Sequence, residues 1–206
     1  MEKSKRKEME FQLRRTEILR EAEKIFAWKG FHNATMAEIA NASGFAIGTL
    51  YHFFDGKKIL YTTMVTEKNE KMYSEIREAV NREEIIINKI KKLVESQFHF
   101  VENNADFCDL LLRGEGMTVS DGGATLRERL IVDYFKHIGF VAEIMRLGME
   151  AKIFKTKDSQ MMAYALLGII RAFIYYWMLT ERDTPLSDKI DCVTDIFLKG
   201  VMPEVT

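Results

Sequence analysis

Proline, glycine and cysteine are scarce in this sequence of 206 residues. It has two prolines, 12 glycines and two cysteines, while 47% of its residues are hydrophobic. This composition excludes a collagen-like or disordered chain and favours a soluble, mainly helical protein. The cysteines, Cys108 and Cys192, lie far apart and match no metal or redox spacing. We expect two buried thiols in a reducing compartment, and neither a metal nor a cofactor.

Long uninterrupted apolar runs are also missing. The N-terminus, residues 1–8, is charged and is not followed by the apolar stretch of a secretory signal. The most apolar segment, residues 161–179, is interrupted by Arg171 and flanked by charges, which favours a buried helix over a membrane span. We therefore expect a cytoplasmic protein without a membrane role.

Neither sign of charge dominates, because the formal net charge is -1. That balance argues against indiscriminate binding to nucleic acid. The charge is nevertheless uneven: residues 1–60 carry 11 Lys and Arg against 8 Asp and Glu, and the remainder carries 19 against 23. A modestly basic N-terminal part on an acidic body fits a protein that places one face on phosphates.

Apolar spacing and capping signals predict four helices in the N-terminal third. Apolar residues recur at helical intervals within residues 11–29, and Gly30 is placed to end this first helix. Thr35 followed by Glu38 is typical of a capping box that starts a second helix. Gly44 permits a sharp turn before a third helix over residues 46–53, and a fourth begins at about Lys57 and continues to about Val80.

The rest of the chain predicts further helices and no strand. Apolar periodicity supports helices over residues 83–102, 107–113, 125–151, 159–179 and 187–201. We therefore expect an all-α protein of about nine helices in two domains. Residues 1–56 would form a three-helix helix-turn-helix domain, and residues 57–206 a larger helical domain.

The segment from residue 35 to residue 60 carries a resemblance to a known family. Two short helices joined by a glycine-bearing turn form a helix-turn-helix. The pattern Ile39-Ala40, Gly44, Gly48-Thr49-Leu50-Tyr51-His52, Phe54, Lys57 and Leu60 resembles the N-terminal domain of TetR-type transcriptional regulators, over residues 12–62. The resemblance implies an N-terminal DNA-binding domain and a C-terminal domain for dimerisation and effector binding.

The candidate DNA contacts lie at the start of the second helix, on the third helix and at the start of the fourth. A helix N-terminus at Thr35 can meet a phosphate, although Thr35 can equally serve as a cap. Gly48 lets the backbone approach DNA, while hydroxyl, phenol and imidazole groups can reach bases or phosphates. The full set is Thr35, Met36, Ala46, Ile47, Gly48, Thr49, Tyr51, His52 and Lys57. Leu50 and Phe54 are expected in the core.

The third helix departs from the family pattern at its first residues. Ala46 and Ile47 stand where many members have a polar residue and a lysine, so a side-chain cap and a cation are missing. Ile47 can instead touch a thymine methyl. Affinity would then rely more on Lys57 and Lys58 and on a basic tail, although such a charge run is usually only a solvated end. The tail comprises Lys3, Lys5, Arg6 and Lys7.

The resemblance further implies a homodimer formed through the last two helices, a pseudo-palindromic operator and an unknown small effector. Residues 159–179 are apolar nearly all round, so a partner subunit is expected to cover them. Aromatic and methionine residues suit a hydrophobic ligand, although each can equally be core. Arg113, His137 or Arg171 could supply a polar anchor. The candidate pocket residues are Phe98, Phe107, Leu111, Arg113, Met117, Phe135, His137, Met145 and Arg171.

Two other functional classes were compared with a ligand-released repressor. An enzyme is disfavoured because the four histidines and two cysteines show no metal-ligand spacing, and Asp133 with His137 is explained by an exposed ion pair. An architectural DNA-binding dimer without an effector would leave every aromatic residue in the core. Relief of repression by a ligand is the family's usual logic, and activation stays open.

Overall fold

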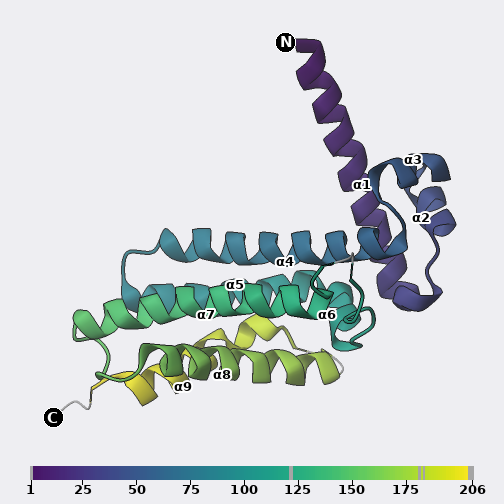
Figure 1. The fold of residues 1–206 in the computed structure, drawn as a ribbon. Helices are drawn as coiled ribbons and strands as arrows, with labels where there is room; N and C mark the ends of the chain where they lie inside the picture. The colour runs from purple at the N-terminus through teal and green to yellow at the C-terminus, as the bar shows by residue number, and fades with distance from the viewer. Residues whose placement is uncertain (1, 121–122, 181, 183, 204–206) are drawn as a thin grey trace. The chain divides into compact units, whose positions relative to one another are not determined.

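The computed structural model describes residues 2–120, 123–180, 182 and 184–203, with side chains from residue 5 onward in these ranges. The described chain is all-α, as predicted, and contains nine α-helices and one short 3-10 helix (Figure 1). The α-helices are α1 (Glu2–Asn33), α2 (Met36–Ser43), α3 (Ile47–Phe53), α4 (Lys57–Asn81), α5 (Ile86–Asn103), α6 (Ala105–Leu112), α7 (Leu126–Glu150), α8 (Ser159–Leu179) and α9 (Ile190–Val201).

Helix α1 starts at Glu2, well before the predicted start at residue 11. Its first turns bury little, so they carry no apolar periodicity, and pairs four residues apart support them instead. Gln12 donates to Glu8 at 2.9 Å, and Arg14 pairs with Glu10. Gly30 interrupts the helix with φ +79° and ψ 167°, which confirms the predicted stop, and one further turn reaches Asn33.

The predicted capping box of α2 is present. The Thr35 hydroxyl accepts from the Glu38 amide at 3.3 Å, and the Glu38 carboxylate accepts from the Thr35 amide at 3.1 Å. Gly44 ends α2 in the left-handed region at φ +72°, so the chain turns sharply into α3. Leu50 and Phe54 are buried as predicted, and Ala46 provides no side-chain cap to α3.

Three aromatic rings hold α1 and the start of α4 together. Phe26 lies edge-on to Tyr61 with ring centroids 4.9 Å apart, and Phe31 lies 4.8 Å from Tyr61. On the side of α1 that faces this core, Ile18, Ala22 and Phe26 are fully buried. Because α1 and α4 enclose this core, they fix the ends of the segment that contains α2 and α3.

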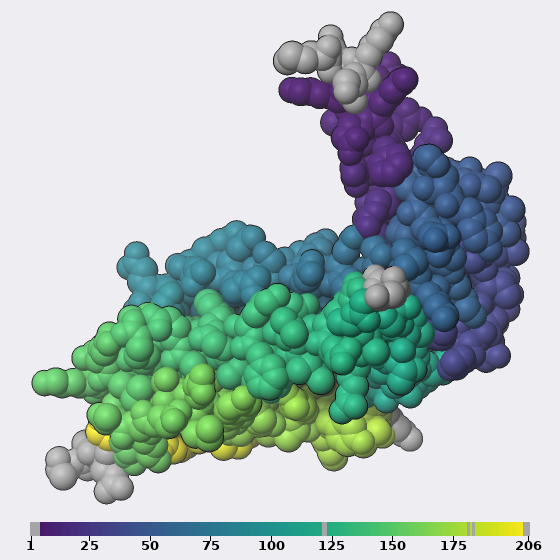
Figure 2. Space-filling view, viewed as in Figure 1, coloured from purple at the N-terminus to yellow at the C-terminus, as the bar shows by residue number. Residues whose placement is uncertain are grey.

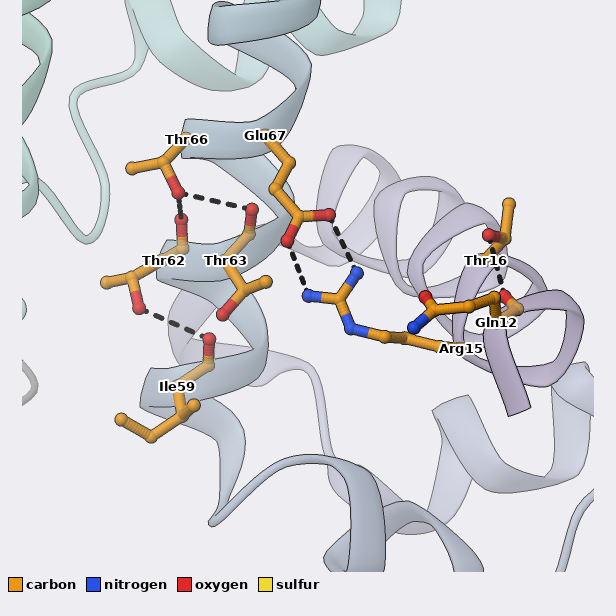
Figure 3. A network of polar contacts seen from close by, with 8 residues as sticks. All are labelled: Gln12, Arg15, Thr16, Ile59, Thr62, Thr63, Thr66 and Glu67. Atoms are coloured by element: carbon orange, nitrogen blue, oxygen red, sulfur yellow. Dashed lines mark hydrogen bonds and ion pairs between the residues drawn. The ribbon is translucent and has the colours of Figure 1, made fainter. Parts of the chain in front are cut away.

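Two ion pairs join the same helices at the edge of this core. Both terminal nitrogens of Arg15 on α1 donate hydrogen bonds to the carboxylate of Glu67 on α4, one of them at 2.8 Å (Figure 3). Lys68 of α4 pairs with Glu23 of α1. A planar guanidinium matches a carboxylate in this two-pronged geometry. The pairs therefore set the rotation of α1 against α4 as well as their separation.

The described chain divides into two compact units. The first unit comprises Met1–Asn69 and Asp106–Leu130, and the second comprises Glu70–Ala105 and Ile131–Thr206. In the first unit, the segment after α6 is attached to the three-helix module. Tyr61 donates to the carbonyl of Glu115 at 2.9 Å, and Arg113 donates to the carbonyl of Ala27 at 2.7 Å. The predicted domain boundary after residue 56 stays a prediction.

The second unit is built around α5, α8 and α9. Helix α5 buries one continuous stripe, because its apolar residues recur every three or four positions. The stripe comprises Ile90, Leu93, Val94, Phe98 and Val101. Near the end of α5, Glu102 accepts from the amide of Ser187 at 2.8 Å in the 3-10 helix (Leu186–Lys189). This hydrogen bond holds the connection between α8 and α9 against the end of α5.

Two predictions about individual side chains are wrong. Cys192 is exposed and Cys108 is half-buried, so the cysteines are not a pair of buried thiols. Asp133 and His137 form no exposed ion pair, because His137 is buried and Asp133 accepts from Lys136 at 2.9 Å. Helical spacing alone gave no sign that position 137 faces the interior.

Helix α8 is long and apolar enough to cross a membrane by length and composition alone. Core helices of soluble proteins meet the same criterion. Within the described chain, a third of its most apolar window is buried.

His137 of α7 is a buried histidine in the second unit. Its ring stacks on Tyr73 with centroids 4.5 Å apart, and its Nε2 lies 3.3 Å from the Gln97 side-chain amide. Within the described residues, its Nδ1 has no hydrogen-bond partner. Burial, with a smaller effect of the Arg77 charge, lowers the pKa of His137 to about 4, so the ring is neutral at pH 7.

This burial predicts a specific pH dependence of stability. Between pH 6.5 and pH 4 the unfolded chain protonates this histidine while the folded chain does not, so the free energy of unfolding falls as the pH falls. The contribution approaches about 3 kcal/mol below pH 4. Urea unfolding of His137→Gln at fixed protein concentration is expected to show a shallower loss of stability over this range than the parent chain.

The matched control is His99→Gln, because His99 is exposed on α5. It is expected to keep the parent's pH dependence. A His137→Gln curve parallel to that of the parent chain would show that burial of His137 does not govern the response.

Candidate nucleic-acid interface

Helix α3 presents a small exposed face on a buried base. Leu50 fixes the helix in the core of the first unit. Opposite it, Tyr51 is 54% exposed, Ile47 is 46% exposed, and Gly48 and His52 also face solvent. Because Gly48 has no side chain and no atom lies within 4 Å of where one would begin, the backbone is open there. The face therefore offers a phenol, an imidazole and an apolar branched chain around an accessible backbone.

Thr49 and Ala46 occupy the flanks of this face. Thr49 is half-buried, and Ala46 is exposed in extended backbone just before the first turn of α3. The Ala46 carbonyl accepts from the Thr49 amide at 2.8 Å, which starts the helix without help from a side chain. The predicted residues of α3 are thus brought together on one surface.

The first turn of α2 exposes backbone amides. The amides of Met36 and Ala37 have no carbonyl partner within the helix, as is true of the first amides of every α-helix. Thr35 is exposed beside them. The side chain of Met36, one of the predicted DNA contacts, is buried, so only its backbone is open to a ligand. This turn could hold an anion through amides and the Thr35 hydroxyl.

Glu38 is occupied by the cap and by a lysine. It accepts from the amide and the hydroxyl of Thr35 and pairs with Lys29 of α1. The Lys29 ammonium, followed by the Thr35 hydrogen bonds, lowers the pKa of the Glu38 carboxyl. The only carboxylate in the first turn of α2 is therefore turned toward these partners.

Lys57 serves the structure of the module. Its ammonium donates to the carbonyls of His32 and Ala34 at 2.9 and 2.8 Å, and it lies 4.9 Å from the centre of the Phe31 ring. An ammonium has three donors, so one remains for a phosphate. Lys58 beside it is exposed. The sequence predicted only the phosphate contact and missed the role of Lys57 in holding the end of α1.

The candidate effector residues fall in both units. In the first unit, Phe107 is buried, and Leu111 and Met117 are half-buried. The Arg113 guanidinium donates a hydrogen bond to the carbonyl of Ala27. In the second unit, Phe98 and Met145 are fully buried.

Phe135 is a correction, because its side chain is 56% exposed and does not line the interior of its unit. The Arg171 guanidinium is exposed and lies 4.6 Å from the centre of the Tyr134 ring. Of the three polar anchors considered from the sequence, only His137 combines burial with an unpaired ring nitrogen among the described residues.

The sequence reasoning missed a second surface beside α3. Phe11 and Arg14 of α1 line a groove with Thr49 and His52 of α3. The available signal was their spacing with Lys7 and Glu10, which places all four on one face of a helix. Because the sequence predicts this helix only from residue 11, Lys7 and Glu10 fall outside the predicted helix.

Comparisons with known proteins agree with this geometry. Residues 18–63 match the model of the bacterial regulatory proteins of the tetR family. The chain is 28% identical to the HTH-type transcriptional regulator UidR of Escherichia coli K12 over 137 residues, which are 66% of this chain and 67% of UidR.

Solved structures share the whole fold. The fatty acid degradation regulator FadR from Bacillus halodurans aligns with a TM-score of 0.77 at 21% identity, over 91% of this chain and 95% of that one. FadR from Bacillus subtilis, in complex with stearoyl-CoA, aligns with a TM-score of 0.76 at 17% identity, over 90% of this chain and 98% of that one. Residues 18–63 therefore form a helix-turn-helix domain of the tetR type, and the chain shares the fold of these solved structures.

Proposed function

We propose that this regulator is a sequence-specific repressor that binds duplex DNA through α3. The observation that supports it is the exposed face of Ile47, Gly48, Tyr51 and His52, carried on a helix whose opposite side is buried. An α-helix fits the major groove, where each base pair presents a distinct set of donors, acceptors and methyl groups. Tyr51 and His52 would donate to bases or phosphates, and Ile47 would touch a thymine methyl.

The surrounding elements would position α3 on the phosphate backbone. The first turn of α2, with Thr35 and the amides of Met36 and Ala37, can bind one phosphate. The start of α4 supplies Lys58 and the remaining donor of Lys57. Such contacts fix the orientation of the reading helix and carry no sequence information themselves.

We further propose that α8 and α9 form a homodimer. The apolar residues of α8 that its own chain leaves exposed recur every three or four positions, so they share one face. Tyr176 and Leu179 are 72% and 67% exposed, and on α9 Ile196 is exposed beside the small Gly200. A second copy would remove this apolar surface from water. The α8 face comprises Met161, Tyr164, Ala165, Gly168, Ala172, Tyr175, Tyr176 and Leu179.

A two-fold dimer would present two copies of α3 to the same face of a duplex. The operator would then be a pseudo-palindrome with half-sites about one helical turn or slightly more apart. Since the ligands are chromosomal DNA and a metabolite, the working location of the protein would be the cytoplasm.

The effector that we propose is a small, mainly hydrophobic molecule bound in the second unit. Support comes from the unpaired Nδ1 of His137 beside Tyr73 and Gln97, which a ligand polar group could satisfy. The stearoyl-CoA complex of Bacillus subtilis FadR makes an acyl-CoA the natural first probe. A ligand can release DNA only if it prefers a conformation with lower operator affinity.

The alternative is an architectural DNA-binding dimer without an effector, in which His137 is simply part of the core. The two functions differ in whether stearoyl-CoA, compared with free coenzyme A, changes operator affinity.

Selection of bound sequences from random duplex DNA is expected to yield an inverted repeat. On that operator, Tyr51→Ala should weaken binding about tenfold, in the range of one lost base contact. Tyr51→Phe should fall between the parent and Tyr51→Ala if the phenol hydroxyl donates a hydrogen bond. Fluorescence anisotropy with labelled duplex measures each affinity at one salt concentration.

Ile85→Ala is the control for that series, because Ile85 is an exposed apolar residue at the start of α5. Its affinity should equal that of the parent chain. Recovery of a single asymmetric site would contradict the dimer, and an unchanged affinity for Tyr51→Ala would remove Tyr51 from the interface.

The chain has two matching capping boxes, and comparing variants of the two distinguishes an effect on DNA binding from an effect on helix stability. Thr125 and Glu128 form the same arrangement at the start of α7 as Thr35 and Glu38 at α2, with the Thr125 hydroxyl accepting at 3.3 Å. Thr35→Ala and Thr125→Ala should each cost about 1 kcal/mol of unfolding free energy. Only Thr35→Ala is expected to weaken operator binding. Equal affinities for the two variants would mean that Thr35 is a cap alone.

A further inference from the structure

The N-terminal half of α1 forms a groove with α3. Lys7, Glu10, Phe11 and Arg14 line one wall, and the other wall is Gly48, Thr49, His52 and Phe53, with a volume of about 500 Å³. Positions 7, 10, 11 and 14 share one face of a helix. In Figure 2 the part of α1 drawn in purple extends beyond the surface of α2 and α3. The face that looks onto this groove therefore continues the surface proposed to read DNA.

Aromatic contacts fix α1 against α3 at this point. The rings of Phe11 and Phe53 lie 4.5 Å apart, and Phe11 meets His52 edge-on at 6.4 Å with an interplanar angle of 88°. His52 in turn lies 5.8 Å from Phe53. The imidazole that faces solvent on α3 is thus packed on a side chain from the N-terminal half of α1. Phe11 is therefore a positioning residue for His52.

The charges of the groove favour an anion. Lys7 and Arg14 each lie about one helical turn from Glu10, on opposite sides of it, and Glu10 is paired with Arg14. Lys5 and Arg6 add exposed positive charge at the same end of α1. Two cations beside the rings of Phe11 and Phe53 suit a sugar-phosphate strand, which has charged oxygens and an apolar sugar.

We propose that this groove holds the phosphodiester strand that borders the major groove entered by α3, with Lys7 and Arg14 binding its phosphates. The inference rests on the proposed function, because it needs α3 in the major groove. Helix α1 then acts as a clamp on the backbone. It also explains the long exposed start of α1, which contributes little to the core of its unit.

The test compares two lysines on the same helix. Lys7 lines the groove, whereas Lys24 is an exposed lysine farther along α1 that pairs with Glu21 at 2.7 Å. Operator affinity is measured across a series of salt concentrations for the full-length parent, Lys7→Ala and Lys24→Ala. Lys7→Ala should weaken binding about five- to tenfold and reduce the slope of log affinity against log salt by about one. Lys24→Ala should leave the slope unchanged.

A phosphate contact carries no sequence information, so Lys7→Ala should weaken binding to the operator and to a scrambled duplex by the same factor. Phe11→Ala should weaken operator binding without changing the salt slope, and Phe11→Leu should restore part of the loss. Circular dichroism and the melting temperature identify any variant that has lost its fold.

Failure of this inference and failure of the proposed function would give different results. Equal salt slopes for folded Lys7→Ala and the parent, on an operator that the parent binds specifically, overturn this inference and leave the proposed function standing. A parent chain that prefers no duplex sequence overturns both.

Discussion

The closure of α1 onto the start of α4 is the constraint on which the reading surface depends. Helix α3 has seven residues, far fewer than an isolated helix needs to persist in water. Its position comes from Leu50 and Phe54 in the core and from the Phe26, Phe31 and Tyr61 cluster that joins the flanking helices. A rigid frame thus lets a short helix present its side chains in a fixed geometry.

Polar contacts complete that frame at its open ends. Lys57 donates to the carbonyl of His32 in the last turn of α1 and to that of Ala34 just after it, where the helix offers no further amides. The Arg15–Glu67 pair fixes the opposite side. Lys57 links stability with function, because the same ammonium closes the frame and has one donor left for DNA. Its substitution is therefore a poor probe of DNA contact alone, whereas residues 7 and 51 are cleaner.

Much of the fold could be predicted because local chemistry determined it. The Thr35–Glu38 cap, the left-handed glycines at positions 30 and 44 and the buried Leu50 all follow from short-range patterns. The early start of α1 could not be predicted, since its exposed turns have no apolar period. The burial of His137 and the exposure of Phe135 and Cys192 depend on how distant helices pack, which spacing along one helix does not encode.

The candidate site divides in the same way. The residue types of α3 indicated a DNA-reading face, while the groove with Phe11 and Arg14 emerged only from the path of α1. Amide hydrogen exchange of the full chain, with and without its selected operator, tests the central claim most directly. DNA binding is expected to slow exchange in the first turn of α2, along α3 and in α1 beside Phe11. Slower exchange confined to α8 and α9, or none anywhere, would contradict it.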